Sequence, residues 1–195
     1  TDSEVLLQMD CRKSGGGLRR IVGLEIRGHY PTSSFGPYPY TGGIVNIDCD
    51  VAIEDSTLVD NHALYGSGGG VRNHGPLLIT RTTFVGNGGS SGGAISNSSV
   101  VDIVESVFRD NRGPAGPDYN SGGGAIRNDT SGDVFIEDTL FDGNKTSSGC
   151  CSGGAILNDG RIEIVRSVIE NSRGSAVTNS GLVTLRGARL ANNSE

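Results

Sequence analysis

The stretch GGAIRNDTSGDVFIEDTLFDGN, residues 123–144, holds two short phrases whose recurrence decides the fold. The first phrase is Gly-Gly-Ala-Ile-x-Asn, here Gly123–Asn128, and it returns as Gly92–Asn97 and Gly153–Asn158. Looser copies end at Asn46, Asn73 and Asn179, and residues 15–20 form a degenerate first copy. Internal similarity of this kind is the signature of a repeat architecture, in which each unit packs on the next.

The second phrase is apolar-x-x-Ser/Thr-x-Phe-x-x-Asn, and it follows the first each time. Clear copies run over residues 79–87, 103–111 and 136–144, with variants at 53–61 and 185–193. The copy that begins at Ile164 is expected to slip its asparagine to Asn171.

The length of the repeat predicts three short strands joined by turns. The first-phrase asparagines Asn46, Asn73, Asn97, Asn128, Asn158 and Asn179 are separated by 27, 24, 31, 30 and 21 residues. Apolar, partly β-branched runs such as 77–79, 134–136 and 183–185 are bounded by Gly, Asn, Ser and Pro, and none shows a sustained helical spacing. We therefore expect an all-β solenoid of roughly seven rungs in a single domain over residues 1–195. Residues 1–40 would form degenerate first rungs with a loop, and residues 41–195 the regular repeats.

A side chain that stacks on the equivalent residue of the next repeat must be able to make a favourable contact with an identical side chain. Asparagine can donate to and accept from an asparagine above and below, and it tolerates the left-handed backbone of a tight turn. The repeats therefore predict two internal asparagine ladders. The first comprises Asn46, Asn73, Asn97, Asn128, Asn158 and Asn179, and the second Asn61, Asn87, Asn111 and Asn144.

The pairing of Gly-Gly-Ala-Ile with Phe-x-x-Asn resembles the repeat of the polymorphic outer-membrane proteins. More broadly, it is similar to the pectin-lyase-like β-helix proteins of bacterial surfaces. The resemblance covers roughly residues 41–193 and implies a right-handed parallel β-helix, a secreted or cell-surface location, and adhesin-like or passenger functions. It carries over no active site, and no outer-membrane barrel is recognisable in the chain.

The net charge and the hydropathy of the chain limit the kinds of partner that it can be expected to bind. The net charge of −6 and the pI of about 5.0 disfavour a nucleic-acid partner. No stretch approaches the roughly 18 apolar residues of a membrane span, so we expect none. No signal peptide is seen, and Thr1 would open a mature or excised segment.

Candidate catalytic groups are carboxylates on outward strand positions. Asp48, Asp50, Glu54 and Asp55 lie in one rung, and Asp102 with Glu105 and Glu137 with Asp138 in later ones. Glu105 and Glu137 could align with Glu54 along one face, where paired carboxylates could do acid/base work or hold calcium. The favoured interpretation is plain surface polarity.

No known catalytic motif supports an enzyme. We expect His29, His62 and His74 to share no repeat position with a nucleophile or a metal-ligand spacing, and no zinc, phosphate-loop or hydrolase motif occurs. We therefore expect no catalytic residues, metal or cofactor. Asn97, Asn128 and Asn144 match the glycosylation pattern, but as ladder positions they should point inward.

Four cysteines suit an extracellular, oxidising compartment. Cys11 and Cys49 can pair within one chain, whereas Cys49 and Cys150 should lie about 19 Å apart along the axis, given the strand spacing of a sheet. Cys150 and Cys151 could form a vicinal bond, or one of them could reach a neighbouring subunit.

An aromatic loop is the main irregular feature. Tyr30, Phe35, Tyr38 and Tyr40 alternate with prolines, and they either cap the solenoid or form a binding surface for a partner, a glycan or another subunit. No capping helix is visible at either end, so strand edges would be satisfied by further repeats or by other copies.

These observations predict a non-catalytic extracellular structural protein that assembles head to tail into a filament, its main partner being itself. The alternatives are an adhesin or glycan-binding passenger segment, with surface glycans or host proteins as partners, and a polysaccharide lyase or hydrolase.

Overall fold

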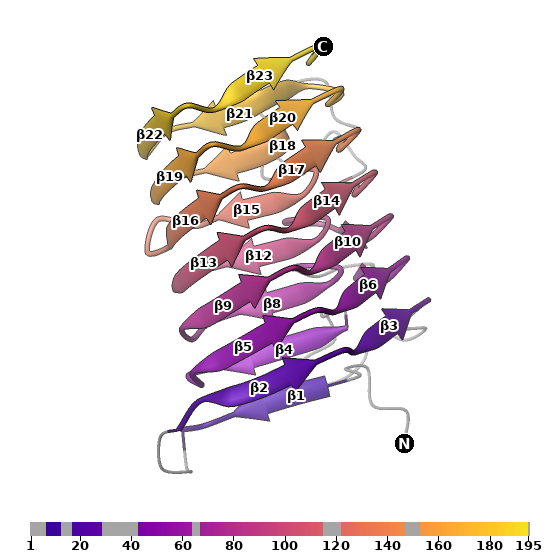
Figure 1. Cartoon of the computed structure of the whole chain (residues 1–195), viewed down its shortest axis with the longest axis vertical. Coiled ribbons are helices and arrows are strands. Elements are labelled where there is room, and N and C mark those ends of the chain that lie inside the picture. The colour runs from indigo at the N-terminus through magenta and orange to yellow at the C-terminus, as the bar shows by residue number, and fades with distance from the viewer. Residues whose placement is uncertain are drawn as a thin grey trace.

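The computed structural model of the chain describes residues 7–12, 17–28, 43–63, 67–114, 122–146 and 153–194. Every strand pair in these residues is parallel, and they contain no helix. Three seven-stranded sheets account for all strands except a short pair, β7 (His62–Ala63) with β11 (Gly88–Gly89). The chain visits the three sheets in turn, so that each strand lies beside its equivalent from the next repeat (Figure 1). The protein is thus all-β with parallel sheets, compatible with a β-solenoid.

The first sheet contains, in spatial order, β1 (Leu7–Asp10), β4 (Ile44–Ile47), β8 (Val71–Asn73), β12 (Ile95–Asn97), β15 (Ile126–Asn128), β18 (Gly153–Asn158) and β21 (Ser175–Asn179). The second contains β2 (Arg19–Val22), β5 (Val51–Glu54), β9 (Leu77–Thr80), β13 (Val100–Val104), β16 (Asp133–Glu137), β19 (Arg161–Val165) and β22 (Leu182–Arg186). The third contains β3 (Glu25–Arg27), β6 (Thr57–Val59), β10 (Thr83–Val85), β14 (Val107–Arg109), β17 (Leu140–Asp142), β20 (Val168–Glu170) and β23 (Arg189–Ala191).

Alternation along each strand places apolar side chains inside and polar ones outside. In β13, Val101 and Ile103 are fully buried, whereas Val100 and Asp102 are exposed. Because the strands pair in register, each buried position becomes a column of similar side chains, such as Ile79, Ile103 and Ile136. Burying one such side chain contributes roughly 1.5–3 kcal/mol.

The third sheet stacks its phenylalanines. The rings of Phe84, Phe108 and Phe141 lie in successive repeats, with centroids 4.7 Å apart and interplanar angles of 3° and 6°. All three are 0 % exposed. This stacking explains why the second phrase repeats a flat side chain at this position.

Paired glycines permit the close approach of neighbouring repeats. A Cβ on Gly124 would overlap the carbonyl oxygen of Gly154, and one on Gly93 would overlap that of Gly124. The repeated Gly-Gly therefore allows the backbones to pack where any side chain would intrude.

Candidate functional site

The first asparagine ladder runs at the end of the first sheet. Asn73 donates through Nδ2 to Oδ1 of Asn97 at 2.9 Å, and the same bond links Asn97 to Asn128 at 2.9 Å and Asn128 to Asn158 at 2.7 Å. Asn158 continues it to Asn179 at 2.6 Å. The backbone of Asn46 pairs in register with that of Asn73; its side chain lies outside the described part of the structure.

The second ladder lies beyond the third sheet and is more densely bonded. Nδ2 of Asn61, Asn87 and Asn111 donates to Oδ1 of the next ladder residue, ending at Asn144, each time at 3.0 Å. The backbone N–H of each donor residue also reaches that oxygen. Each Nδ2 shares its second hydrogen with a carbonyl of the preceding repeat, such as that of Phe84 for Asn111. All four side chains are fully buried, so the ladder supplies the hydrogen bonds that water would otherwise make to the polar groups of this turn.

Ser172 interrupts this second ladder. The backbones pair so that Lys145 lies beside Arg173, which places Ser172 next to Asn144. The asparagine of this copy stands one position early, as its slip in the sequence indicates: Asn171 occupies the left-handed turn position before the ladder, with φ of 55°. Ser172 is buried, and its hydroxyl has no hydrogen-bond partner among the described residues.

A third internal column consists of hydroxyl side chains that the sequence interpretation did not anticipate. Its members are Ser56, Thr82, Ser106, Thr139 and Ser167, all buried. Each hydroxyl donates to the carbonyl two residues earlier, and four of them accept a backbone N–H from the preceding repeat. The signal was present as the Ser/Thr of the second phrase. The column closes the turn between the second and third sheets.

Charged residues occupy the left-handed position just before that hydroxyl column. Asp55, Arg81, Glu105, Asp138 and Arg166 have φ between 44° and 49°. Arg81 donates to both carboxylate oxygens of Asp55, and Arg166 donates to both of Asp138. These bonds hold the pKa of each aspartate below its usual value. Four of the five residues of this column thus form two ion pairs.

The alignment expected of Glu54, Glu105 and Glu137 holds for Glu54 and Glu137, which share one register column, and fails for Glu105. Glu54 pairs in register with Thr80, which continues through Val104 to Glu137, so the two glutamates stand three strands apart. Glu105 lies one position further, in the left-handed column. Glu54 is bound by Arg20, and Glu137 by Arg166, which leaves no paired carboxylates facing each other here.

The prediction that no histidine shares a repeat position with a nucleophile was also wrong. His74 and Ser98 each follow a ladder asparagine, and the Nδ1 of His74 lies 2.7 Å from the Ser98 hydroxyl. Burial lowers the pKa of His74, reinforced by Arg72 and opposed by Asp129 and Asp48.

This pair lacks the donors of a hydrolytic centre. The Ser98 hydroxyl donates to the Asn73 carbonyl, which also accepts the Ser98 N–H, and the Ser99 N–H is engaged by Asn97. Neither N–H is therefore free to stabilise an oxyanion. The pair closes a turn.

The described residues offer little to a metal ion or to a glycosylating enzyme. Within the described ranges, no three histidine, cysteine, aspartate or glutamate side chains gather to hold a metal ion. No helix of these ranges is long and apolar enough to cross a membrane. Asn97, Asn128 and Asn144 are 0 % exposed in their ladders. A fourth Asn-x-Ser pattern, at Asn192, escaped the sequence interpretation, and its asparagine is exposed.

Cys11 and Cys49 form a disulfide that joins the chain after β1 to the chain after β4. Their Cα atoms are 5.1 Å apart, and Cys49 is buried against the core. Cys150 and Cys151 lie outside the described residues, as do Tyr30, Phe35, Tyr38, Tyr40 and His29.

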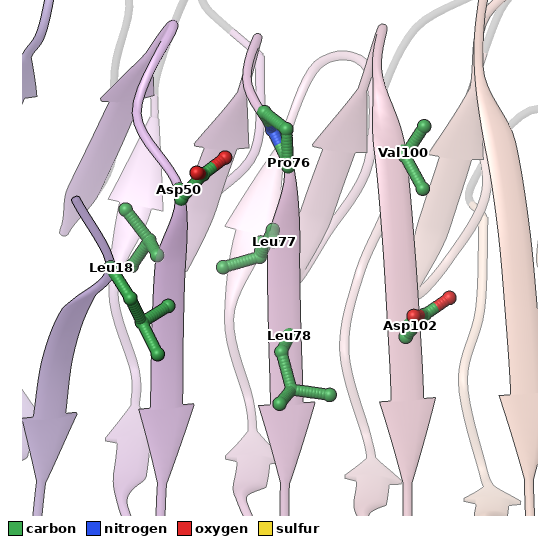
Figure 2. A pocket seen from close by; sticks show the side chains of 8 residues that line it. Leu18, Asp50, Pro76, Leu77, Leu78, Val100 and Asp102 are labelled. Carbon is green, nitrogen blue, oxygen red and sulfur yellow. The ribbon is translucent and has the colours of Figure 1, made fainter. Parts of the chain in front are cut away.

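A shallow groove of about 250 Å³ lies on the outward face of the second sheet (Figure 2). Its lining residues come from four adjacent strands or the residues just before them: Leu18, Asp50, Val51, Pro76, Leu77, Leu78, Val100 and Asp102. Asp50 and Asp102 were among the acidic residues singled out from the sequence, but the apolar part was missed. The unbroken run Pro76–Ile79 was its signal, because a strand apolar on both faces exposes one of them.

No protein-family model, no curated protein and no solved structure matches this chain. The candidate surfaces are therefore interpreted from their geometry.

Proposed function

We propose that the chain is a right-handed parallel β-helix of seven rungs that serves as a non-catalytic extracellular structural protein. In this proposal, copies stack end to end into a filament. The repeat phrases support a relationship to the polymorphic outer-membrane proteins and their pectin-lyase-like architecture. The Cys11–Cys49 disulfide supports an oxidising compartment.

One observation carries the proposal of stacking. The surface formed by β21, β22 and β23 exposes side chains that belong to interior columns. Val183, Leu185 and Leu190 are 36 %, 46 % and 45 % exposed, whereas their equivalents one repeat earlier, Ile162, Ile164 and Ile169, are 0 % exposed. Exposed apolar side chains beside unpaired strand edges favour a further layer of strands.

The opposite surface, formed by β1, β2 and β3, offers a matching layer. If the columns continue in register, Leu185 meets Ile21 of the next copy, whereas Ile26, in the column of Leu190, is only 3 % exposed and offers little free surface. Arg189 then lies over Glu25, an opposite charge. Head-to-tail contacts of this kind do not close on themselves, so they build a filament.

Arg19 is the least favourable position of this match, because it would lie over Val183 in an interior column. Its guanidinium donates to the Gly17 carbonyl, which keeps the charged group at the edge while the aliphatic stem faces the column.

The test is sedimentation velocity and negative-stain electron microscopy of the full chain. We expect concentration-dependent filaments that Leu185→Lys abolishes, because it would bury a charge between copies. The matched control is Thr184→Lys on the same strand, whose side chain faces outward and should leave assembly intact. A monodisperse single particle at all concentrations would contradict the proposal. Filaments that shorten under reductant in the wild type but keep the same shorter length with and without reductant in Cys150→Ser with Cys151→Ser would assign an intermolecular bond to one of these two cysteines.

A further inference from the structure

The outward face of the second sheet is unusual in its apolar content. Eight large apolar side chains of the described residues are exposed. Three of them are the interior-column residues of the β21–β23 surface. The remaining five, Leu18, Val22, Leu78, Val100 and Leu182, all belong to the second sheet or immediately precede one of its strands. Such a concentration on one face marks an interaction surface, since isolated exposed apolar residues would scatter over all three sheets.

The groove contains three of these five residues. Leu18, Leu78 and Val100 surround a floor formed by Pro76 and Leu77 (Figure 2). None of the lining residues is aromatic, and the lining carries two carboxylates and no cation. The groove therefore suits an aliphatic side chain accompanied by positive charge.

The two carboxylates lack the partners that other charged groups on this face possess. Arg20 binds Glu54, Asp133 lies 3.8 Å from Arg161, and Glu163 lies 3.1 Å from Arg186. Glu137 is bound by Arg166. Among the described outward-facing charged side chains of the second sheet, only Asp50 and Asp102 have no ion pair within the described chain.

Asp102 is also held in an unfavourable environment for its charge. Partial burial raises the pKa of its carboxyl, and the nearby Asp133 raises it further. A cation placed beside Asp102 would relieve both effects.

The spacing of the carboxylates selects the ligand. Asp50 lies just before β5 and Asp102 within β13, two strands and two residue positions apart, which corresponds to about 12 Å between Cα atoms. In an extended peptide, side chains at positions i and i+4 lie on one side, about 13 Å apart, with that of i+2 between them. We propose that this groove binds an extended segment of a partner protein in which two basic residues, four positions apart, flank an aliphatic residue.

The proposal concerns the side of the stack and is independent of end-to-end assembly. A basic residue would sit at each of Asp50 and Asp102, and the aliphatic side chain would cover Leu78. The exposed carboxylates disfavour an anionic lipid surface at the same place.

Saturation-transfer difference NMR tests the proposal, because it detects weak ligands on single molecules and filaments alike. The probe is acetyl-Lys-Thr-Leu-Thr-Lys-amide. We expect saturation at the leucine methyl and lysine methylene protons, with none for the analogue that replaces both lysines by glutamate, and much less for the one that replaces leucine by serine.

The protein variants locate the site. Asp50→Asn with Asp102→Asn should raise the Kd about fivefold to tenfold, since two exposed ion pairs are lost. The matched control is Asp60→Asn with Asp110→Asn, two exposed turn aspartates on another edge of the stack, which should leave the Kd unchanged. No saturation transfer, equal transfer to all three peptides, or equal weakening by both double variants would overturn the proposal. The comparison of the three peptides on the unaltered protein tests the proposal even if a variant fails to fold.

Discussion

Asn144 and Ser172 occupy adjacent positions of one internal column, and of the two only the Asn144 side chain has hydrogen-bond partners among the described residues. Oδ1 of Asn144 accepts from both the backbone N–H and the side chain of Asn111, and its Nδ2 donates to the Phe108 carbonyl. The buried Ser172 hydroxyl has no partner among the described residues. A buried polar group without a partner is destabilising, and the column shows which side chain would satisfy it.

Replacing Ser172 by asparagine should therefore stabilise the protein. The new Oδ1 would accept from Asn144, and the new Nδ2 would donate to the Phe141 carbonyl, as its equivalents do. Each such bond contributes about 1 kcal/mol, so we expect the free energy of unfolding to rise by about 1–2 kcal/mol in urea titrations. Ser167→Asn is the control and should destabilise the fold, because the Ser167 hydroxyl is already engaged. A loss of stability on Ser172→Asn would show that the site cannot accept the larger side chain.

Asn111→Leu should destabilise the second ladder at its centre. The change removes the acceptor of the Asn87 N–H and of one Nδ2 hydrogen of Asn87, and the side-chain donor to the Phe84 carbonyl. Unsatisfied buried groups cost about 1–3 kcal/mol each, and partial relaxation should bring the total to about 3–5 kcal/mol. Chemical denaturation measures the loss, and the neighbouring exposed Asp110→Asn should change stability by less than about 0.5 kcal/mol. Equal effects of the two variants would argue against the ladder as a stabilising element.

Phe108→Ala should remove the middle ring of the phenylalanine stack. Large-to-small changes at fully buried aromatic positions cost about 3–5 kcal/mol, through lost burial and the cavity left behind. Phe108→Leu keeps much of the volume and should cost less than half as much. Thermal unfolding of both variants tests this order, and equal melting temperatures would contradict the ring-on-ring packing.

Stability should fall as the pH drops below about 6.5, the ordinary histidine pKa. Burial lowers the pKa of His62 and of His74 in the folded protein. The unfolded chain then binds protons that the folded chain does not, so the loss begins near pH 6.5 and continues until the folded-state pKa values are reached. Urea titrations at pH 7.5, 6.5 and 5.5 measure this slope, and His74→Gln should flatten it. A rise in stability over the same range would mean that protonated histidine is favoured in the fold.

Reduction should weaken the Cys11–Cys49 end of the stack selectively. The disulfide closes a segment with a sequence separation of 38 residues. A disulfide that closes a loop of that size stabilises the folded state by about 4 kcal/mol in the chain-entropy model. Hydrogen exchange in reductant should therefore accelerate in β1 and β2 and remain slow in β13 and β16. Uniform acceleration along the chain would indicate a single cooperative unit instead.

The two repeat phrases were sufficient to anticipate an all-β chain of parallel strands. The reason is local: short β-branched runs between Gly and Asn turns cannot form helices, and a fixed internal similarity requires stacking. The types of the stacked side chains could be anticipated as well, because asparagine can hydrogen bond to asparagine and the flat ring of phenylalanine can stack on another phenylalanine.

One-residue offsets could not be read from the sequence. The placement of Glu105 missed by a single position, and the His74–Ser98 contact was overlooked. A shift of one residue moves a side chain from one face of a strand to the other. Because the spacing between equivalent asparagines varies from 21 to 31 residues, only the backbone pairing fixes which residues share a column.

The sequence by itself determined the class of structure, because repeated local patterns act within a few residues. Only the tertiary structure decided which columns carry charge pairs, where the hydroxyl column runs, and that Leu18, Leu78 and Val100 line one groove with Asp50 and Asp102. These residues are far apart in the chain, and they come together because parallel strands from successive repeats align at the strand spacing.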